Sequence, residues 1–219
     1  MNATIQRIEL GFVNAYLVET PLGFVLVDAG VPHSWDRLKA ALDAAGCSPG
    51  RLLLVLLTHG DMDHIGCALR LREEFGVPIA VHSGDCGMVE SGEDQKRRGS
   101  SLAVRLAMRF RKHHPDPGAP YLSPDLLLED GQSLAEYGWD ACVVHCPGHT
   151  LGSVAILTSA GDLIVGDTAS NMTRPGPGML VQDATAYNRT LKMLAALPAK
   201  TVHPGHGKPF PHERMPRHL

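Results

Sequence analysis

The chain has 219 residues, of which 44% are hydrophobic and 20% are charged, a balance typical of a globular protein and unlike that of disordered or collagen-like chains. Twenty basic and 23 acidic residues give a formal net charge of −3. A protein with this net charge does not have the overall positive field that attracts nucleic acid or anionic membranes, so we expect neither as a partner.

The first elements are expected to be strands, at residues 5–10, 14–20 and 24–30. Residues 34–45 place apolar side chains at helical spacing and are followed by Gly46, which predicts a helix that ends there. Residues 52–58, LLLVLLT, form a continuous apolar run, which is typical of a strand covered on both faces.

The polar sequence THGDMDHIG ends this strand, and a helix is expected from there to Phe75, followed by a short strand at residues 78–82. Ligand groups collect in loops at the carboxyl ends of strands in such an arrangement. Later strands are expected at residues 125–130, 140–150, 153–159, 162–168 and 200–203, and a last helix at 184–197. Two sheets packed against each other, with helices outside, fit this order of elements.

Residues 91–124 differ from the rest of the chain. The segment begins with the polar sequence SGEDQKRRGSS, continues as a basic stretch with helical character, and ends in the irregular sequence PDPGAP. We interpret it as an insertion or lid within one domain that spans residues 1–219.

The cysteines and the amino-terminal sequence indicate the cellular compartment. The five cysteines are spread along the chain, form no CxxC pair and are odd in number, which favours reduced thiols over a disulfide framework. The chain does not open with a basic segment followed by an apolar run, and no apolar stretch reaches the roughly 18 residues of a membrane span. We therefore expect a cytoplasmic protein.

Imidazoles and carboxylates follow four of the expected strands, at the point where each strand ends. The 12 histidines of the chain outnumber its aromatic residues, which are 2 Trp, 4 Tyr and 5 Phe. Loops that follow four different strands can bring their side chains together only at one edge of the sheets. The residues in question are His59, Asp61, Asp63, His64, His149, Asp167 and His206.

These seven side chains exceed the needs of one tetrahedral ion and suffice for two divalent ions that share a carboxylate and a hydroxide. Zinc is the first expectation, with iron and manganese as alternatives. A hydroxide held between two ions about 3.5–4 Å apart is a nucleophile at neutral pH. The sequence therefore predicts a hydrolase for a small-molecule ester, thioester, lactone or phosphoester, in which Asp63 orients the attacking water or takes its proton.

With these motifs the sequence resembles the metallo-β-lactamase superfamily over nearly its whole length, from LVDAG at 26–30 to PGHG at 204–207. The resemblance implies an α+β fold, a four-layer αββα sandwich of two mixed β-sheets with helices outside and two metal ions at the open edge. It also implies that Asp28, in LVDAG, supports the metal-binding loops without binding metal itself. The ligand sets that it implies are His59, residue 61 and His149 for one ion, Asp63, His64 and His206 for the other, and Asp167 as the bridge.

Position 61 departs from the pattern of the superfamily, whose motif His-x-His-x-Asp-His has a histidine where this chain has Asp61. With two divalent ions, three carboxylates and a hydroxide the centre would be neutral, whereas a histidine at this position would leave one positive charge. A neutral centre is a weaker Lewis acid and favours harder metals. Asp61 could instead form hydrogen bonds to the ligands and leave one ion short of a ligand.

Two other functions remain open at this stage. A carboxylate at position 61 is similar to the flavodiiron proteins, which hold two irons, although their flavin domain has no counterpart in this sequence; persulfide dioxygenases use one iron on this scaffold, but with a histidine at this position. A di-iron or mono-iron oxidoreductase is therefore the first alternative. A non-catalytic metal-binding protein is the second, and the full set of candidate ligands argues against it.

The substrate is less well defined than the chemistry. Thioesterases of the glyoxalase II type bind glutathione through a carboxyl-terminal extension that has no counterpart after His206. The basic stretch at 96–114 is either a lid for an anionic small molecule or a solvated helix face or homodimer contact. The weak candidates for substrate contacts are Arg105, Arg109, Asn171 and Arg174.

Several other polar residues are expected to have structural roles. We interpret His82 and Asp85 as residues that brace a loop near the metals. His145 and His203 lie within expected strands and are assigned to the core or to a sheet face, and Tyr187 is assigned to the core.

Overall fold

The computed structural model describes residues 3–92, 98–99 and 121–219. Its first sheet has the strand order β1-β2-β3-β4-β5-β7. The pairs β1–β2 and β2–β3 are antiparallel, and the pairs from β3 to β7 are parallel, so the sheet is mixed. The strands are β1 (Thr4–Glu9), β2 (Asn14–Glu19), β3 (Phe24–Val27), β4 (Leu52–Leu56), β5 (Ile79–His82) and β7 (Leu126–Leu128).

The second sheet has the order β14-β13-β10-β9-β8, with β11 paired to β10. It is also mixed, because β10 and β13 are parallel while the other pairs are antiparallel. A separate short pair joins β6 (Arg98–Gly99) to β12 (Leu180–Val181). The strands of the second sheet are β8 (Ala141–His145), β9 (Val154–Thr158), β10 (Asp162–Asn171), β11 (Gly176–Pro177), β13 (Thr201–Gly207) and β14 (Phe210–Pro211).

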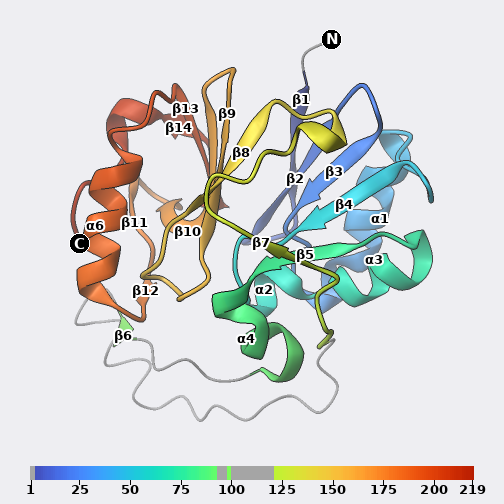
Figure 1. Cartoon of the computed structure of the whole chain (residues 1–219), viewed down its shortest axis with the longest axis horizontal. Helices are drawn as coiled ribbons and strands as arrows, with labels where there is room; N and C mark the ends of the chain where they lie inside the picture. Colours follow the sequence, from blue (N-terminus) through green and yellow to red (C-terminus); the bar gives the residue numbers. More distant parts are fainter. Residues whose placement is uncertain (1–2, 93–97, 100–120) are drawn as a thin grey trace.

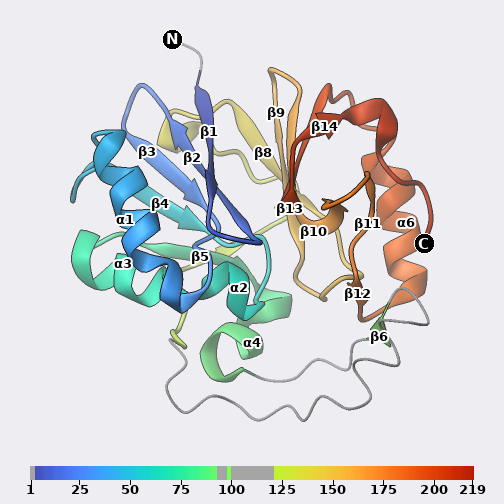
Figure 2. The ribbon, with the colours of Figure 1, turned by 180° about the vertical axis from the view of Figure 1, so that it is seen from behind.

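The helices of eight or more residues lie on the outer faces of the two sheets, and the shorter ones lie at one edge of the sandwich, as Figures 1 and 2 show from opposite sides. Among the described residues, no helix is both long and apolar enough to cross a membrane. The α-helices are α1 (Trp35–Ala44), α2 (Met62–Ile65), α3 (Ala68–Phe75), α4 (Cys86–Ser91) and α6 (Ala184–Leu194). Short 3-10 turns occupy Pro32–Ser34, Ser83–Asp85, Ala135–Tyr137 and His212–Arg214.

Three buried clusters correspond to the three interfaces between the layers. Leu38 and Leu71 pack α1 and α3 against one face of the first sheet. Leu191 packs α6 against the second sheet. Between the sheets, Leu56 of β4 and Ile156 of β9 belong to one cluster. The four-layer αββα sandwich is therefore confirmed.

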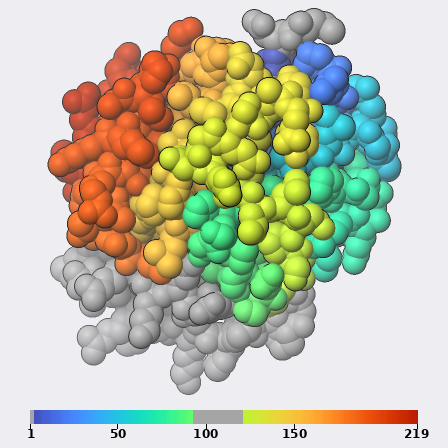
Figure 3. All heavy atoms as spheres, viewed as in Figure 1, coloured from blue at the N-terminus to red at the C-terminus, as the bar shows by residue number. Residues whose placement is uncertain are grey.

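The segment between β7 and β8 connects the two sheets. It contains Leu134 and Trp139, which are both buried in the cluster between the sheets. On the face shown in Figure 3, this segment (yellow) lies between the α6 side of the molecule (orange to red) and the α3–α4 side (cyan to green). It therefore covers one side of the core between the sheets.

The helix expected from the polar loop to Phe75 is broken into α2 and α3. The break follows Gly66, whose backbone N–H donates to the carbonyl of Gly30 at 2.8 Å. A Cβ atom at Gly66 would lie 2.5 Å from that carbonyl and from Pro32, so the chain at this point packs against the loop after β3 more closely than a continuous helix allows. The expected helix at 184–197 ends at Leu194, and the basic stretch at 96–114 lies almost entirely outside the described residues.

Candidate metal centre

The loop after β4 carries four of the seven predicted ligands. His59 lies in this loop, and Asp61 has extended backbone (φ −72°, ψ 144°) at the position that precedes α2. Asp63 and His64 lie within α2 itself, and the N–H of His64 donates to the carbonyl of Asp61 at 2.8 Å. Because the backbone changes from extended to helical after Asp61, the side chains of His59 and Asp61 point to a different part of the site from those of Asp63 and His64.

Asp167 and His206 lie inside strands. Asp167 falls near the end of the strand expected at 162–168, whereas His206 was expected in a loop after the strand at 200–203. Both β10 and β13 continue past the predicted ends, and their pairing shifts register on either side of Gly166. Gly166 has a positive φ of 49°, a conformation that L side chains rarely adopt. The irregular register thus turns the Asp167 carboxylate toward the metal-binding loops without ending the strand.

The structure brings all seven predicted side chains together at one edge of the sandwich. The Asp167 carboxylate is central, because its Oδ1 lies 3.2 Å from Nε2 of His64 and its Oδ2 lies 3.2 Å from Nε2 of His206 and 4.0 Å from Nε2 of His149. Three sets of three side chains each contain ligand-type atoms that all lie within 4.8 Å of the others in the same set. They are His59, Asp61 and His149; His59, His64 and Asp167; and Asp63, His64 and His206.

Asp61 lies where the superfamily has a histidine, and its carboxylate faces two imidazoles. Its Oδ2 lies 3.1 Å from Nε2 of His149 and 3.4 Å from Nε2 of His59. The side chain is only 11% exposed. The shorter aspartate side chain therefore reaches the same group of ligand atoms.

Three atoms at the centre fit bound cations. Nε2 of His59, Nε2 of His64 and Oδ1 of Asp167 are buried and lack a hydrogen-bond partner, since the approach between His64 and Asp167 is not aligned as a hydrogen bond. A buried polar atom left unsatisfied costs about 1–3 kcal/mol, and three at one point are rarely tolerated without a ligand. Imidazole nitrogens and carboxylate oxygens in this arrangement suit a borderline divalent ion.

The opposite ring nitrogen of each of the four histidines is held by a neighbouring group. Nδ1 of His64 lies 2.8 Å from Oδ2 of Asp28, and Nδ1 of His59 lies 3.0 Å from the hydroxyl of Thr58. The remaining two donate to backbone carbonyls, at Leu180 for His149 (2.8 Å) and at Phe12 for His206 (2.7 Å). A proton on each Nδ1 makes Nε2 the nitrogen of each ring that can bind a metal.

Asp28 has the supporting role that the resemblance implied. It is fully buried and is the one non-glycine residue with positive φ (62°) among those described. Its carboxylate accepts from the backbone N–H of Thr58 at 2.8 Å and from the Thr58 hydroxyl, and it also contacts His64. One carboxylate thus connects the end of β3 with both ends of the loop after β4.

Asp85 braces two loops that carry candidate metal ligands, in agreement with the loop-bracing role expected of it. Its buried carboxylate accepts from the N–H of Gly60 (2.9 Å), the hydroxyl of Thr150 (2.7 Å) and the N–H of Gly152 (2.7 Å). These bonds join the His59 loop to the loop that carries His149. His82, the other residue expected to brace a loop, accepts from the N–H of Gly84 and stacks on His145 with ring centroids 4.0 Å apart.

The remaining predicted residues fall into different places. Tyr187 is fully buried, and its hydroxyl donates to the carbonyl of Thr168, as a core residue would. Asn171 lines a cavity beside the site and donates to the carbonyl of Lys208 at 2.8 Å. Arg174 is not part of that cavity lining. Arg105 and Arg109 lie outside the described residues.

The sequence analysis did not identify Phe12, which contacts His206 through both its ring and its backbone carbonyl. Its ring stacks on His206, with centroids 5.7 Å apart and an angle of 4° between the ring planes, and its carbonyl orients the same imidazole. Phe12 lies in the hairpin between β1 and β2, nearly 200 residues away in the sequence. Only the apolar side chain in a predicted turn could have indicated it.

Metal uptake by the metal-free protein should release protons. Burial disfavours the cationic form of His206, yet the carboxylates of Asp167 and Asp63 raise its pKa from 6.5 to about 10. Burial also opposes the cationic form of His64, but Asp28 and Asp167 raise the pKa of that imidazole well above 6.5. His206 therefore carries an extra proton at pH 7.5, which a metal must displace from Nε2, and the raised pKa of His64 favours the same requirement there.

We expect at least the proton of His206 to be released on saturation with metal at pH 7.5, and apparent metal affinity to rise with pH toward 10. Calorimetric titration of zinc into the metal-free protein, in buffers with different ionisation enthalpies, measures the number. A pH-independent affinity without proton release would contradict these pKa shifts.

The comparisons with known proteins agree with this geometry. The family model for the metallo-beta-lactamase superfamily matches residues 8–206. The chain is 26% identical over 230 residues to the "Probable metallo-hydrolase YflN" of Bacillus subtilis, with 94% of this chain and 84% of that protein covered. It is 30% identical over 182 residues to the hydroxyacylglutathione hydrolase of Acidiphilium cryptum, covering 82% of this chain but only 60% of that protein.

Among solved structures, the protein TTHA1623 in a di-iron-bound form is similar, with a TM-score of 0.69, 31% sequence identity and 94% of each chain covered. The range matched by the family model, residues 8–206, includes all seven candidate ligands. Because the family model also extends over nearly the whole chain, the protein belongs to the metallo-β-lactamase superfamily.

Proposed function

We propose that the protein is a dinuclear metallo-hydrolase that acts on a small molecule. The observation that carries the proposal is the convergence of seven imidazoles and carboxylates, three atoms of which are buried without a hydrogen-bond partner. In this proposal one ion would be held by His59, Asp61 and His149 and the other by Asp63, His64 and His206, and Asp167 would be available to both.

The bound ions would supply Lewis acidity and would lower the pKa of a bound water. The chain supplies the rest of the chemistry. Asp63 is the most exposed of the three carboxylates, with 28% of its side chain accessible, so it can meet a water from the open side of the site. Its Oδ2 lies 3.4 Å from Nε2 of His206, and in this position it orients the attacking water and takes its proton.

The substrate class follows from this chemistry and is supported by the relatives. A polarised carbonyl or phosphoryl oxygen and an ionised water suit esters, thioesters, lactones and phosphoesters. The similarity to a hydroxyacylglutathione hydrolase supports including thioesters among these classes. We propose zinc as the metal and the cytoplasm as the location, the latter because all five cysteines are unpaired.

The decisive experiment is elemental analysis of protein purified without added metal, followed by a substrate panel before and after chelation. The panel contains S-lactoylglutathione, an acylhomoserine lactone and bis(4-nitrophenyl) phosphate. Two equivalents of zinc and hydrolysis that is lost on chelation and restored by zinc would support the proposal. Stoichiometric metal without turnover of any ester, thioester, lactone or phosphoester would indicate a non-catalytic metal-binding protein.

A second candidate function is a di-iron oxidoreductase. The observation in its favour is the Asp61 carboxylate, which adds a hard oxygen ligand near His59 and His149 and thereby favours iron over zinc. The similar structure in a di-iron-bound form is consistent with this. Two equivalents of iron, oxygen consumption with a reductant, and no hydrolysis would replace the hydrolase proposal with this one.

A further inference from the structure

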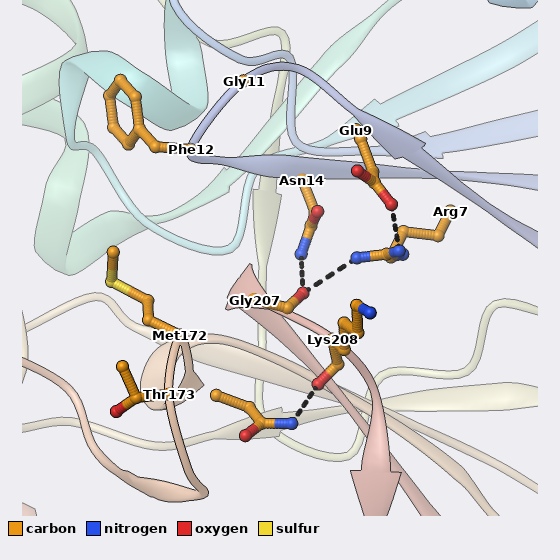
Figure 4. A pocket seen from close by; sticks show the side chains of 10 residues that line it. Arg7, Glu9, Gly11, Phe12, Asn14, Met172, Thr173, Gly207 and Lys208 are labelled. Atoms are coloured by element: carbon orange, nitrogen blue, oxygen red, sulfur yellow. Dashed lines mark hydrogen bonds and ion pairs between the residues drawn. The ribbon is translucent and has the colours of Figure 1, made fainter.

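A cavity of about 470 Å³ lies beside the metal centre, a size that accommodates part of a small organic molecule. Figure 4 shows that its wall is built from three segments: the strands and hairpin of β1 and β2, the end of β10 and the end of β13. None of the proposed metal ligands lines it. The lining residues used below are Arg7, Glu9, Phe12, Met172 and Lys208.

The cavity is next to the metal centre because the two share a wall. Phe12 lines the cavity, and its ring stacks on His206 while its carbonyl holds Nδ1 of the same imidazole. Gly207, directly after His206, also lines the cavity. A molecule that reacts at the metals can therefore extend past His206 into this space.

One part of the cavity wall is apolar. Phe12 and Met172 are 55% and 56% exposed, values that leave large apolar surfaces in contact with water. They come from two different segments, and both line the cavity. Covering both would be favourable by about 25 cal/mol per Å² of apolar surface, so the cavity suits an apolar group.

The other part carries an available positive charge. Arg7 is neutralised by Glu9, and its guanidinium also donates to the carbonyl of Gly207. Lys208 is exposed, and no carboxylate of the described residues pairs with its ammonium group. Its backbone is held in place because its carbonyl accepts from Asn171 at 2.8 Å. The net charge of the lining is therefore positive and is concentrated at Lys208.

We propose that this cavity binds the part of the substrate that is not cleaved, and that this part is an apolar chain ending in an anionic carboxylate or phosphate. The chain covers Phe12 and Met172, and its anionic end is neutralised by Lys208. The inference rests on the proposed hydrolase function and adds the substrate class: amphiphilic anions rather than neutral esters.

The test compares three esters of equal chain length: 4-nitrophenyl hexanoate, its ω-carboxylate counterpart 4-nitrophenyl hydrogen adipate, and the 4-nitrophenyl ester of 6-(phosphonooxy)hexanoic acid. In Lys208→Met we expect KM for the better anionic ester to rise about tenfold with kcat unchanged, and KM for the hexanoate to stay the same. In Lys208→Arg, which keeps the positive charge, KM for the anionic ester should stay close to that of the unmodified enzyme. The better of the two anionic esters identifies the terminal group.

Lys192→Met is the matched control, because Lys192 is an exposed lysine on α6, away from the cavity lining. Met172→Ala should raise KM for all three esters alike. Equal KM values for neutral and anionic esters in the unmodified enzyme, or the same change in the Lys208 and Lys192 variants, would overturn the inference.

A binding measurement separates failure of this inference from failure of the hydrolase proposal. In ligand-observed NMR with adipate, we expect binding to the unmodified holoprotein and weaker binding to Lys208→Met. If no ester is hydrolysed but adipate binds in this Lys208-dependent way, the cavity assignment stands and the proposed reaction fails. If esters are hydrolysed without any role for Lys208, the reaction stands and the cavity assignment fails.

Discussion

Replacing Asp167 with asparagine should reduce kcat/KM by about three orders of magnitude and lower the bound metal from two equivalents to one. Asp167 places its two oxygens near His64, His206 and His149, so it contacts both of the proposed ion positions. Asparagine keeps the shape of the side chain but removes the negative charge. Losing several kcal/mol of charge stabilisation at a two-metal centre corresponds to an effect of about this size.

Asp162→Asn provides the matched control for this prediction. It is the same substitution on the same strand, and Asp162 pairs with His203 at 2.8 Å, outside the candidate metal centre. Elemental analysis and steady-state kinetics on both variants, with circular dichroism to verify folding, give the result. An Asp167→Asn protein that retains two ions and an unchanged rate would remove the central role of this carboxylate.

Much of the site could be predicted because its chemistry is written in local sequence. Each candidate ligand belongs to a short motif next to an apolar run, and a run such as residues 52–58 can be recognised as a buried strand without knowing its neighbours. Placing those strands in two sheets then brings the motifs to one edge. The four-layer arrangement itself came from the resemblance, since hydrophobic periodicity does not specify which strands pair.

The parts that could not be predicted depend on contacts between distant segments. The break between α2 and α3 occurs because Gly66 packs against the loop after β3, a contact that helical periodicity does not contain. The continuation of β10 through Asp167 depends on its irregular pairing with β13. The carbonyls of Phe12 and Leu180, which orient two imidazoles, carry no side-chain signal at all.

Position 61 lies between these two cases. The sequence showed that a carboxylate replaces the usual histidine but left open whether it binds metal directly. In the structure its Oδ2 lies within 3.4 Å of Nε2 of both His59 and His149, which is compatible with three ligands around one ion. Direct ligation by Asp61 therefore stays a prediction. Because a carboxylate ligand at this position favours iron over zinc, the identity of the bound metal decides between hydrolysis and redox chemistry.

Gly205→Val should abolish metal binding and activity while the sandwich still folds. A Cβ atom at Gly205 would lie 2.6 Å from Oδ1 of Asp167 and 2.6 Å from Cε1 of His64. The glycine thus lets β13 approach two proposed ligands of the same ion, and a larger residue must displace one of them. Forcing extra atoms into a packed site typically costs about 1–3 kcal/mol, which a domain of this size can tolerate.

Gly176→Val is the control, since a Cβ atom there would meet only the carbonyl of Arg174 at 3.9 Å. We expect Gly176→Val to bind two ions. Gly205→Val should unfold in a cooperative thermal transition whose midpoint temperature does not increase when metal is added. Because stability and metal binding are measured separately, unfolding cannot be mistaken for a damaged site. If Gly205→Val bound metal normally, the Asp167 and His64 side chains could move apart without loss of the centre, and the case for a preformed two-ion site would fail.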